Sequence, residues 1–312
     1  MIASNLAVRL GLRAASRNPE LAFGRALIDQ GGALLGALPA VLAGLLLAGA
    51  LDADLGSFFD AISALRWPVL GAVVVALAIS FAAGAVFWAG ALPLLAADIE
   101  VDRRPPPGNF ALLAARGFAR VLAAAFLSQL LWTLILLAFV LALAFALPVL
   151  WAQPSPGRFA AVALVGTGAF GGALVVDLLS RFWLLRAAAF GEWPAAAFGK
   201  AASLFSARFG QGLVVTLAFF LLEAIAAAVS AGIGGAFSGP ALLGPETAVL
   251  ALAPRIALGL AFAAVFSWLE VGRMGALAAI ACDVEGLLGP EPEPEALPVA
   301  EPVVEALPVE DE

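Results

Sequence analysis

The sequence predicts an all-α, polytopic membrane protein with six transmembrane helices and three amphipathic helices on the cytoplasmic surface. Its composition is the first reason: 63% of the 312 residues are hydrophobic, only 12% are charged, and the mean hydropathy is +1.04. A soluble domain carries about 25% charged residues, because its surface must contact water. The second reason is that six apolar runs reach the length of about 20 residues that a helix needs to cross a hydrocarbon core.

The six apolar runs set the expected helices and the extent of the membrane domain. Amides in lipid must find hydrogen-bond partners within their own segment, so each run is predicted to be helical. A transmembrane β-barrel would instead show short alternating segments, and the sequence contains none. We expect residues 1–282 to form one six-helix domain, with spans at about 31–51, 68–96, 121–151, 159–184, 211–235 and 256–281.

Basic residues predict the direction of the chain across the membrane. Thirteen of the 16 fall on the side of both termini, and only Arg66, Arg158 and Arg255 fall on the other side. Short loops rich in arginine and lysine remain cytoplasmic, so both termini are predicted to be cytoplasmic. Every basic residue except Lys200 is arginine, and alanine, glycine and proline are abundant. This bias is typical of GC-rich bacterial genomes and favours the bacterial inner membrane.

A basic amphipathic segment precedes each odd-numbered span, at 5–16, 109–120 and 194–208. We expect these segments to lie in the interface, with apolar faces toward lipid and cations at anionic headgroups. The chain then reads as three repeats of a surface helix followed by a hairpin. The alternative is that they are ordinary cytoplasmic loops that happen to be helical. The interfacial cations would be Arg9, Arg13, Arg17, Arg116, Arg120, Lys200 and Arg208.

Ionisable residues inside the apolar spans are the sharpest feature of the sequence. Such a residue costs several kcal/mol near the bilayer centre and is a candidate for function by default. Two pairs can form within single helices, because their members are four and three residues apart. Glu223 has no local partner, so it must pair across the bundle, be protonated, or line a wet cavity. The expected polar layer is Asp177, Arg181, Glu223, Glu270, Arg273 and Gln129.

Two interpretations of this layer remain open. It can be a salt-bridged seam that fixes the register of the helices, or a proton, ion or lipid-headgroup site around Glu223.

Stripes of small residues are expected to let helices approach closely. Gly32, Gly36 and Gly44 follow one face of the first span, and Gly168 and Gly172 form a GxxxG motif in the fourth. These positions can serve packing within the chain or contact between copies. Residues 166–171 also spell GxGxxG, but no strand precedes them, so the nucleotide-binding context is missing.

The side-chain inventory disfavours an enzyme. The chain has no histidine and no tyrosine, and its single cysteine, Cys282, excludes an internal disulfide and a thiolate zinc site. We therefore expect no catalytic residues, no metal, no cofactor and no nucleic acid.

The last thirty residues, 283–312, differ from the rest. Ten are acidic and none is basic, so the body without them carries +3 rather than the overall −7. Such a segment cannot bury enough apolar surface to fold, and it is predicted to be a disordered, proline-rich cytoplasmic tail. Its role is open: it can be solubilising, dock a soluble partner, or contact the chain's own cationic helices.

Two short motifs carry a resemblance to known families. They are Arg-Asn-Pro at 17–19 and Trp-Pro-Ala-Ala-Ala-Phe-Gly-Lys at 193–200, the latter followed by Phe209-Gly210. The layout over residues 5–282 resembles uncharacterised six-helix bacterial membrane families, especially the membrane domain attached to some glycerophosphodiester phosphodiesterases. This resemblance implies a fold and an envelope location. It implies no activity, because the sequence contains no phosphodiesterase catalytic domain.

These observations favour a non-enzymatic inner-membrane protein that acts as a scaffold, an assembly factor or an accessory component of the envelope. The alternative is a transporter or channel for an ion, a proton or a lipid, which would use the mid-membrane carboxylates.

Overall fold

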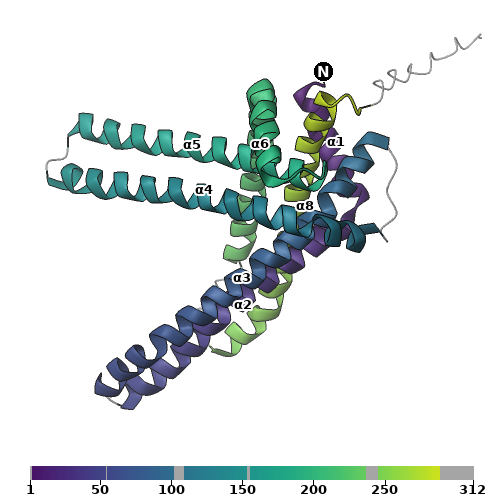
Figure 1. The fold of residues 1–312 in the computed structure, drawn as a ribbon. Coiled ribbons are helices and arrows are strands. Elements are labelled where there is room, and N and C mark those ends of the chain that lie inside the picture. The colour runs from purple at the N-terminus through teal and green to yellow at the C-terminus, as the bar shows by residue number, and fades with distance from the viewer. Residues whose placement is uncertain (1, 54, 102–108, 153–154, 237–244, 289–312) are drawn as a thin grey trace, which may run out of the picture.

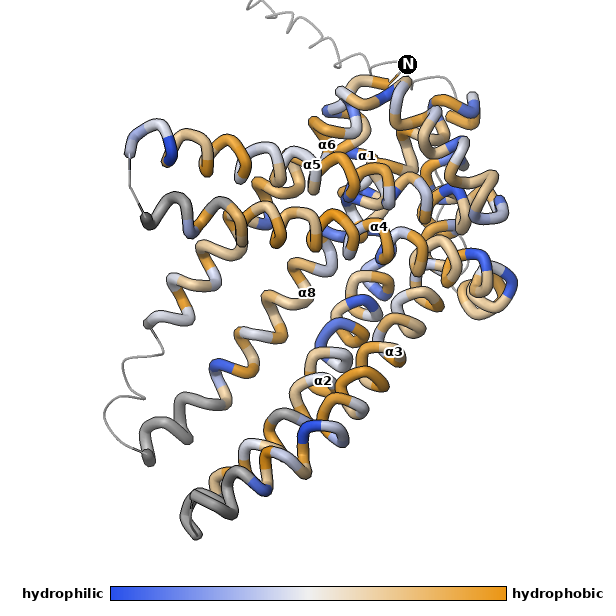
Figure 2. The backbone as a smooth tube through the Cα atoms, turned by 60° about the vertical axis from the view of Figure 1, so that its left-hand side comes forward, coloured by the Kyte–Doolittle hydropathy of each residue, from blue (hydrophilic) through white to orange (hydrophobic). Residues whose placement is uncertain are grey.

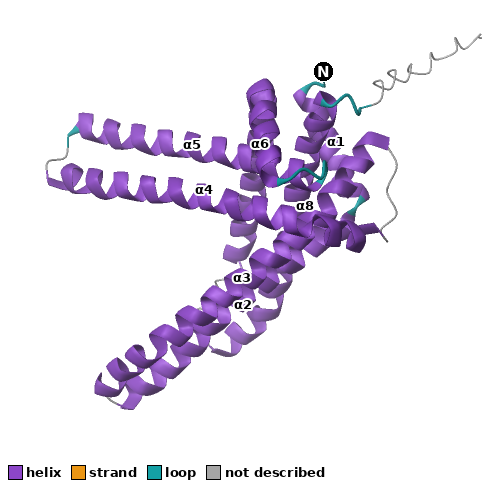
Figure 3. Cartoon of the chain, in the orientation of Figure 1, coloured by secondary structure: helices purple, strands orange, loops and turns teal. Residues whose placement is uncertain are grey.

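A computed structural model describes residues 2–53, 55–101, 109–152, 155–236 and 245–288. These residues are almost entirely α-helical, and no strand occurs among them (Figure 3). Within them, six helices are long and apolar enough to cross a membrane. The expected all-α class and the number of membrane-type helices are thereby confirmed.

In the described part of the chain a short helix, α1 (Ser4–Arg17), comes first, and six long helices follow it. Each long helix contains one expected span and extends beyond it, because the polar residues near the span ends continue the helix. The long helices are α2 (Pro19–Ala53), α3 (Leu55–Val101), α4 (Phe110–Ala152), α5 (Pro156–Ala188), α6 (Pro194–Ala236) and α8 (Pro245–Val284).

The long helices pair into three hairpins that diverge from a common packed region (Figures 1 and 2). We call the described residues of 30–84, 129–175 and 220–266 the first, second and third arms, and the other described residues the hub. Among the described side chains, Ala76 is the only buried one in an arm; the rest of the buried core lies in the hub. The arms expose large apolar side chains such as Leu34, Phe145 and Leu164.

Helix α8 packs against most of the other helices in the hub. Helices adjacent in sequence pack against one another, and α8 also contacts α1, α2 and α3, which are distant in sequence. Its last turns are buried without interruption from Val271 to Cys282. The N-terminal helix and the end of α8 therefore lie side by side, on the side of the molecule opposite the arms (Figure 1).

The first amphipathic segment forms α1, but its small-residue face packs on protein. Ala7, Gly11, Ala14 and Ala15 are buried. A Cβ on Gly11 would lie 2.2 Å from the Gly272 carbonyl oxygen, so α1 and α8 touch backbone to backbone. Leu10 and Leu12, on the side expected to face lipid, are partly buried against the hydrophobic core, and contact of this helix with the membrane interface stays a prediction. Arg9 and Arg13 lie on the exposed side.

The other two amphipathic segments belong to long helices. The segment 109–120 continues into its span within α4. The segment 194–208 is the first part of α6 and ends at a kink, because Arg208 has non-helical angles of φ −127° and ψ 23°. The Arg-Asn-Pro break also takes the expected form. Asn18 caps α1 through its side-chain Nδ2, which donates to the Ala14 carbonyl oxygen at 2.9 Å, and Pro19 begins α2.

Candidate functional site

The charged residues predicted from three separate spans meet in one cluster at the base of the arms. Arg181 on α5 is its centre: its Nε donates to Asp177 Oδ2 at 2.7 Å, and its Nη1 donates to Glu270 Oε1 on α8 at 2.6 Å. The Arg181 side chain is only 15% exposed. One guanidinium thus joins a carboxylate one turn away on its own helix to a carboxylate of another helix, α8.

A second guanidinium completes the cluster. Arg273 binds Glu270 on its own helix, and it lies 3.8 Å from Asp177 Oδ2 and 3.7 Å from Glu223 Oε1. Glu223 comes from α6, so the cluster ties together α5, α6 and α8. Of the alternatives open for Glu223, pairing with an arginine across the helices is the arrangement found. We call this group of five residues the ion-pair cluster: Asp177, Arg181, Glu223, Glu270 and Arg273.

The local pairs form for the reason that the spacing indicates. Side chains four or three positions apart on a helix lie on one face, and this brings Asp177 to Arg181 and Glu270 to Arg273. The contacts between helices require tertiary packing. Gly212 and Gly272 supply close approaches here, since a Cβ on Gly212 would lie 2.9 Å from Leu178 and one on Gly272 would lie 3.0 Å from Phe219.

Sequence reasoning missed one charged pair of the site. Arg25 Nη2 lies 3.0 Å from Asp29 Oδ1, and both residues belong to α2. The Arg25 guanidinium also lies over the ring of Trp88, 5.4 Å from its centroid. The four-residue spacing of Arg25 and Asp29 was visible in the sequence. The sequence places Arg25 on the cytoplasmic side of a span expected at 31–51, whereas the continuous helix α2 begins at Pro19.

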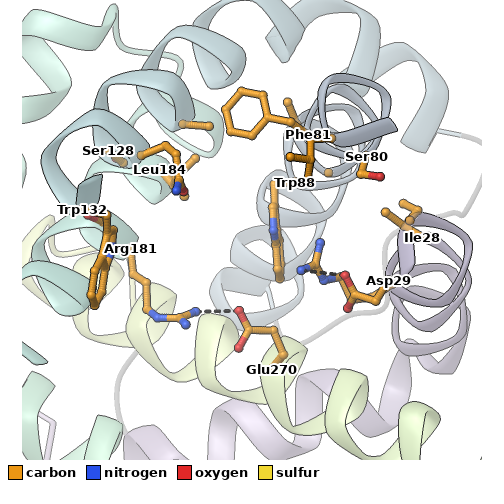
Figure 4. Close-up of a pocket in the computed structure, with 18 of the residues that line it drawn as sticks. Ile28, Asp29, Ser80, Phe81, Trp88, Ser128, Trp132, Arg181, Leu184 and Glu270 are labelled. Carbon is orange, nitrogen blue, oxygen red and sulfur yellow. Dashed lines mark hydrogen bonds and ion pairs between the residues drawn. The ribbon is translucent and has the colours of Figure 1, made fainter. Parts of the chain in front are cut away.

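Asp177, Arg181 and Glu270 of the ion-pair cluster and the Arg25–Asp29 pair form the base of a cavity of about 660 Å³ between the first and second arms. Figure 4 shows Arg181, Glu270 and Asp29 along one side of this cavity and Phe81 on the opposite side. Gln129 lines the cavity, so the structure places it beside the ion-pair cluster. The other main apolar lining residues are Ile28, Leu77, Trp88, Trp132, Leu184 and Met274.

A second cavity, of about 390 Å³, shares Arg25 and Asp29 with the first and lies between α2 and the third arm. Glu223, Glu270 and Arg273 line it together with Ser267 and Phe266. Glu223 is therefore both paired with an arginine and adjacent to a cavity.

The expected glycine stripes do not pack helices within the described part of the chain, except at one position. A Cβ on Gly32 would lie 2.7 Å from Ser80 Oγ, which identifies a close contact between α2 and α3. A Cβ on Gly36, Gly44, Gly168 or Gly172 would meet nothing within 4 Å, so these four are corrected as internal packing positions. The physical reason is that each of these glycines lies on a face of its helix that no other described helix covers. Contact of these positions with a second copy stays a prediction.

Several of the expected interfacial cations have partners in the protein. Arg17 lies 3.7 Å from the buried carboxylate of Asp98, and Arg120 Nη1 donates to the Gly191 carbonyl oxygen at 2.6 Å. The left-handed φ of 67° at Gly191 is the conformation that presents this carbonyl. Lys200 binds Glu192 at 2.8 Å, but its side chain remains 58% exposed. Arg9, Arg13 and Arg116 are exposed.

The start of the acidic tail contacts cations of the hub. Arg208 Nη2 lies 3.1 Å from Asp283 Oδ2, and Arg186 Nη1 lies 2.7 Å from Glu285 Oε1. The alternative of contact with the chain's own cationic helices thus holds for these two acids. Residues 289–312 lie outside the described residues.

Fold and site together define a helical protein of membrane type, with a charged cluster at the point where three hairpins converge. Comparison of the chain with protein-family models, with curated proteins and with solved structures finds no match. The function must therefore be argued from the geometry of the chain itself.

Proposed function

We propose that this chain is a non-enzymatic protein of a bacterial inner membrane that acts as a scaffold for other membrane components. The exposed apolar surface of the arms carries the proposal. Only 6% of the most apolar window of the first span is buried within the chain, and the same fraction holds for the third and fourth spans. Lipid covers such surface, but arms that diverge also leave faces open to helices of other proteins.

The ion-pair cluster supports the same proposal. Its three carboxylates are each within 4 Å of a guanidinium, so their charges are engaged in holding α5, α6 and α8 together. Removing one partner of a buried pair costs about 3–5 kcal/mol, because the other charge is left uncompensated. We infer that this polar layer sets the geometry of the arms, with the hub on the cytoplasmic side.

A second candidate function is favoured by one observation. Glu223 lines the cavity of about 390 Å³. A carboxylate at a cavity within a membrane is a common element of proton and ion pathways. A transporter or channel that uses Glu223 is the alternative.

Photo-crosslinking in the native membrane tests the scaffold. A photoreactive amino acid is placed at Gly44 or Gly168 in the arms, and a control carries it at Lys200 in the hub. The proposal predicts discrete adducts of the arm positions with membrane proteins or with a second copy. Adducts of the arm positions with lipid alone would contradict it.

Flux measurements test the alternative. The intact chain is reconstituted in proteoliposomes, and proton flux is compared between the native protein and the variant Glu223→Gln. The scaffold proposal predicts equal, background-level flux in both. A flux in the native protein that the substitution abolishes would replace the scaffold with a transporter.

A further inference from the structure

The cavity between the first and second arms combines a charged base with apolar walls. Arg25, Asp29, Asp177, Arg181 and Glu270 are among its lining residues. Its apolar walls are formed by aliphatic side chains of α2, α3 and α5 and by two indoles, Trp88 and Trp132. Its volume of about 660 Å³ falls in the range of about 300–1,000 Å³ that is usual for ligand sites.

The position of the cavity favours an amphiphile over a small soluble ligand. The lining continues from the charged base to Gly36 on α2 and Trp132 on α4, where the arms are exposed. The Leu77 side chain in this wall is 62% exposed. A headgroup at the base would therefore have its hydrocarbon chains between two apolar arms.

The charge at the base selects among headgroups. The charged residues that line the base are the carboxylates of Asp29, Asp177 and Glu270 and the guanidiniums of Arg25 and Arg181, which leaves one negative charge in excess when all are ionised. A purely anionic headgroup would be repelled by this excess. A headgroup with both a phosphate and an ammonium meets complementary groups, because guanidiniums bind phosphate and carboxylates bind ammonium.

Two further features of the lining suit a zwitterionic head. The Trp132 ring lines the cavity, and aromatic rings attract organic cations, whereas the Trp88 ring already has the Arg25 guanidinium over it. Gln129 is an exposed side chain at the same cavity, and its amide can donate to a phosphate oxygen.

We propose that the cavity between the first and second arms is a binding site for one zwitterionic phospholipid, with its phosphate and ammonium at the Arg25, Asp29, Asp177, Arg181 and Glu270 base and its acyl chains between the arms. This site is separate from the protein contacts of the scaffold proposal. It stands or falls without that proposal.

Native mass spectrometry of the full chain in detergent tests the site. Phosphatidylethanolamine and phosphatidylglycerol with identical acyl chains are added in turn, and soluble phosphoethanolamine is added as a competitor. We expect one bound phosphatidylethanolamine, retained at least about tenfold better than phosphatidylglycerol. Equal or better retention of phosphatidylglycerol would overturn the proposal. Displacement of the lipid by equimolar phosphoethanolamine would overturn it too, since the acyl chains would then contribute nothing.

A matched pair of substitutions on α4 locates the site. Ala125 lines the cavity, and Ala125→Phe fills part of it without removing a charge. Leu136 is 59% exposed on the same helix and does not line the cavity, so Leu136→Phe is the control. Retention of phosphatidylethanolamine should fall about tenfold in the first variant and stay unchanged in the second. Unchanged retention in Ala125→Phe would overturn the assignment.

Fluorescence of the native chain keeps the test independent of whether a variant folds. Phosphatidylethanolamine brominated on its acyl chains should quench tryptophan emission more strongly than phosphatidylglycerol with the same brominated chains, because Trp88 and Trp132 line the cavity. Equal quenching by both lipids would contradict the proposed site.

Discussion

Arg181 joins helices α5 and α8 through one side chain. It donates to Asp177 on its own helix and to Glu270 on α8, at 2.7 and 2.6 Å. Glu223, by contrast, reaches the cluster through a single contact of 3.7 Å with Arg273. Arg181 therefore makes two short contacts in the cluster and Glu223 makes one longer contact, although each is a single charge inside an apolar span.

Arg181→Gln should lower the stability of the chain much more than Glu223→Gln. The arginine substitution leaves two carboxylates without their closest cation, and breaking a buried ion pair costs about 3–5 kcal/mol. The glutamate substitution removes one longer contact and keeps the volume of the side chain. Thermal unfolding in detergent measures both effects. A larger shift in Tm for Glu223→Gln than for Arg181→Gln would show that Arg181 is not the central tie.

Gly11→Val should detach α1 from the hub. The new Cβ would lie 2.2 Å from the Gly272 carbonyl oxygen and 2.5 Å from the Ala276 nitrogen, which are backbone atoms that cannot move aside cheaply. Gly44→Val is the matched control, because a Cβ there meets nothing within 4 Å. Limited proteolysis near residue 18 measures the detachment. Equal cleavage of the two variants would mean that α1 does not depend on this contact.

At the scale of the elements, the kink in α6 and the end of α8 are joined. Arg208 has the non-helical angles of the kink, and its side chain lies 3.1 Å from Asp283 on α8. The side chains are only 15% and 10% exposed, so water screens this pair less than an ordinary surface ion pair. The pair fixes the first part of α6 against the last turn of α8.

A double-mutant cycle with Arg208→Gln and Asp283→Asn should give a coupling free energy of about 0.5–3 kcal/mol, as is found for residues in direct contact. Lys200 and Glu192 form the comparison pair, since Lys200 is 58% exposed and their coupling should be smaller. Unfolding free energies of the four proteins of each cycle supply the measurement. A coupling free energy for Arg208 and Asp283 no larger than that of the exposed pair would show that this ion pair does not fix α6 against α8.

Much of this organisation was predictable from local pattern. Apolar length gave the six long helices, and residue spacing gave the pairs Asp177–Arg181 and Glu270–Arg273. The bonds from Arg181 to Glu270 and from Arg273 to Glu223 were not predictable in detail, because they depend on how α5, α6 and α8 cross. The role of Gly11 was missed for the same reason. Its partner, Gly272, lies at the other end of the chain, and no periodicity connects the two.

The glycine stripes are a case in which a sequence pattern predicted helix packing that, Gly32 apart, the described part of the structure does not contain. Gly168 and Gly172 satisfy the GxxxG pattern, yet a Cβ built on either would meet no atom of another described helix within 4 Å. Small residues permit close packing but do not specify which helix approaches. Which helices come together depends on the directions of the arms, and the packing of the hub sets those directions.

At the scale of the whole molecule, both the buried side chains and the basic residues distinguish the hub from the arms. Nearly all described buried side chains lie in the hub, and the arms are bare and apolar. Arg66, Arg158 and Arg255 are the basic residues near the far ends of the arms. In Figure 2 the three arms all extend away from the hub toward one side of the molecule. Such a molecule is expected to insert its arms in lipid and keep its hub at the cytoplasmic surface.

Accessibility labelling of single cysteines in intact cells tests this orientation most directly. In a Cys282→Ser background, cysteines at Asp60 and Gly157 mark the ends of two arms, and cysteines at Asn5 and Lys200 mark the hub. A membrane-impermeant maleimide should label the two arm positions in intact cells and the hub positions only after the membrane is opened. Labelling of hub and arm ends from the same side would contradict an arrangement in which the arms cross the membrane.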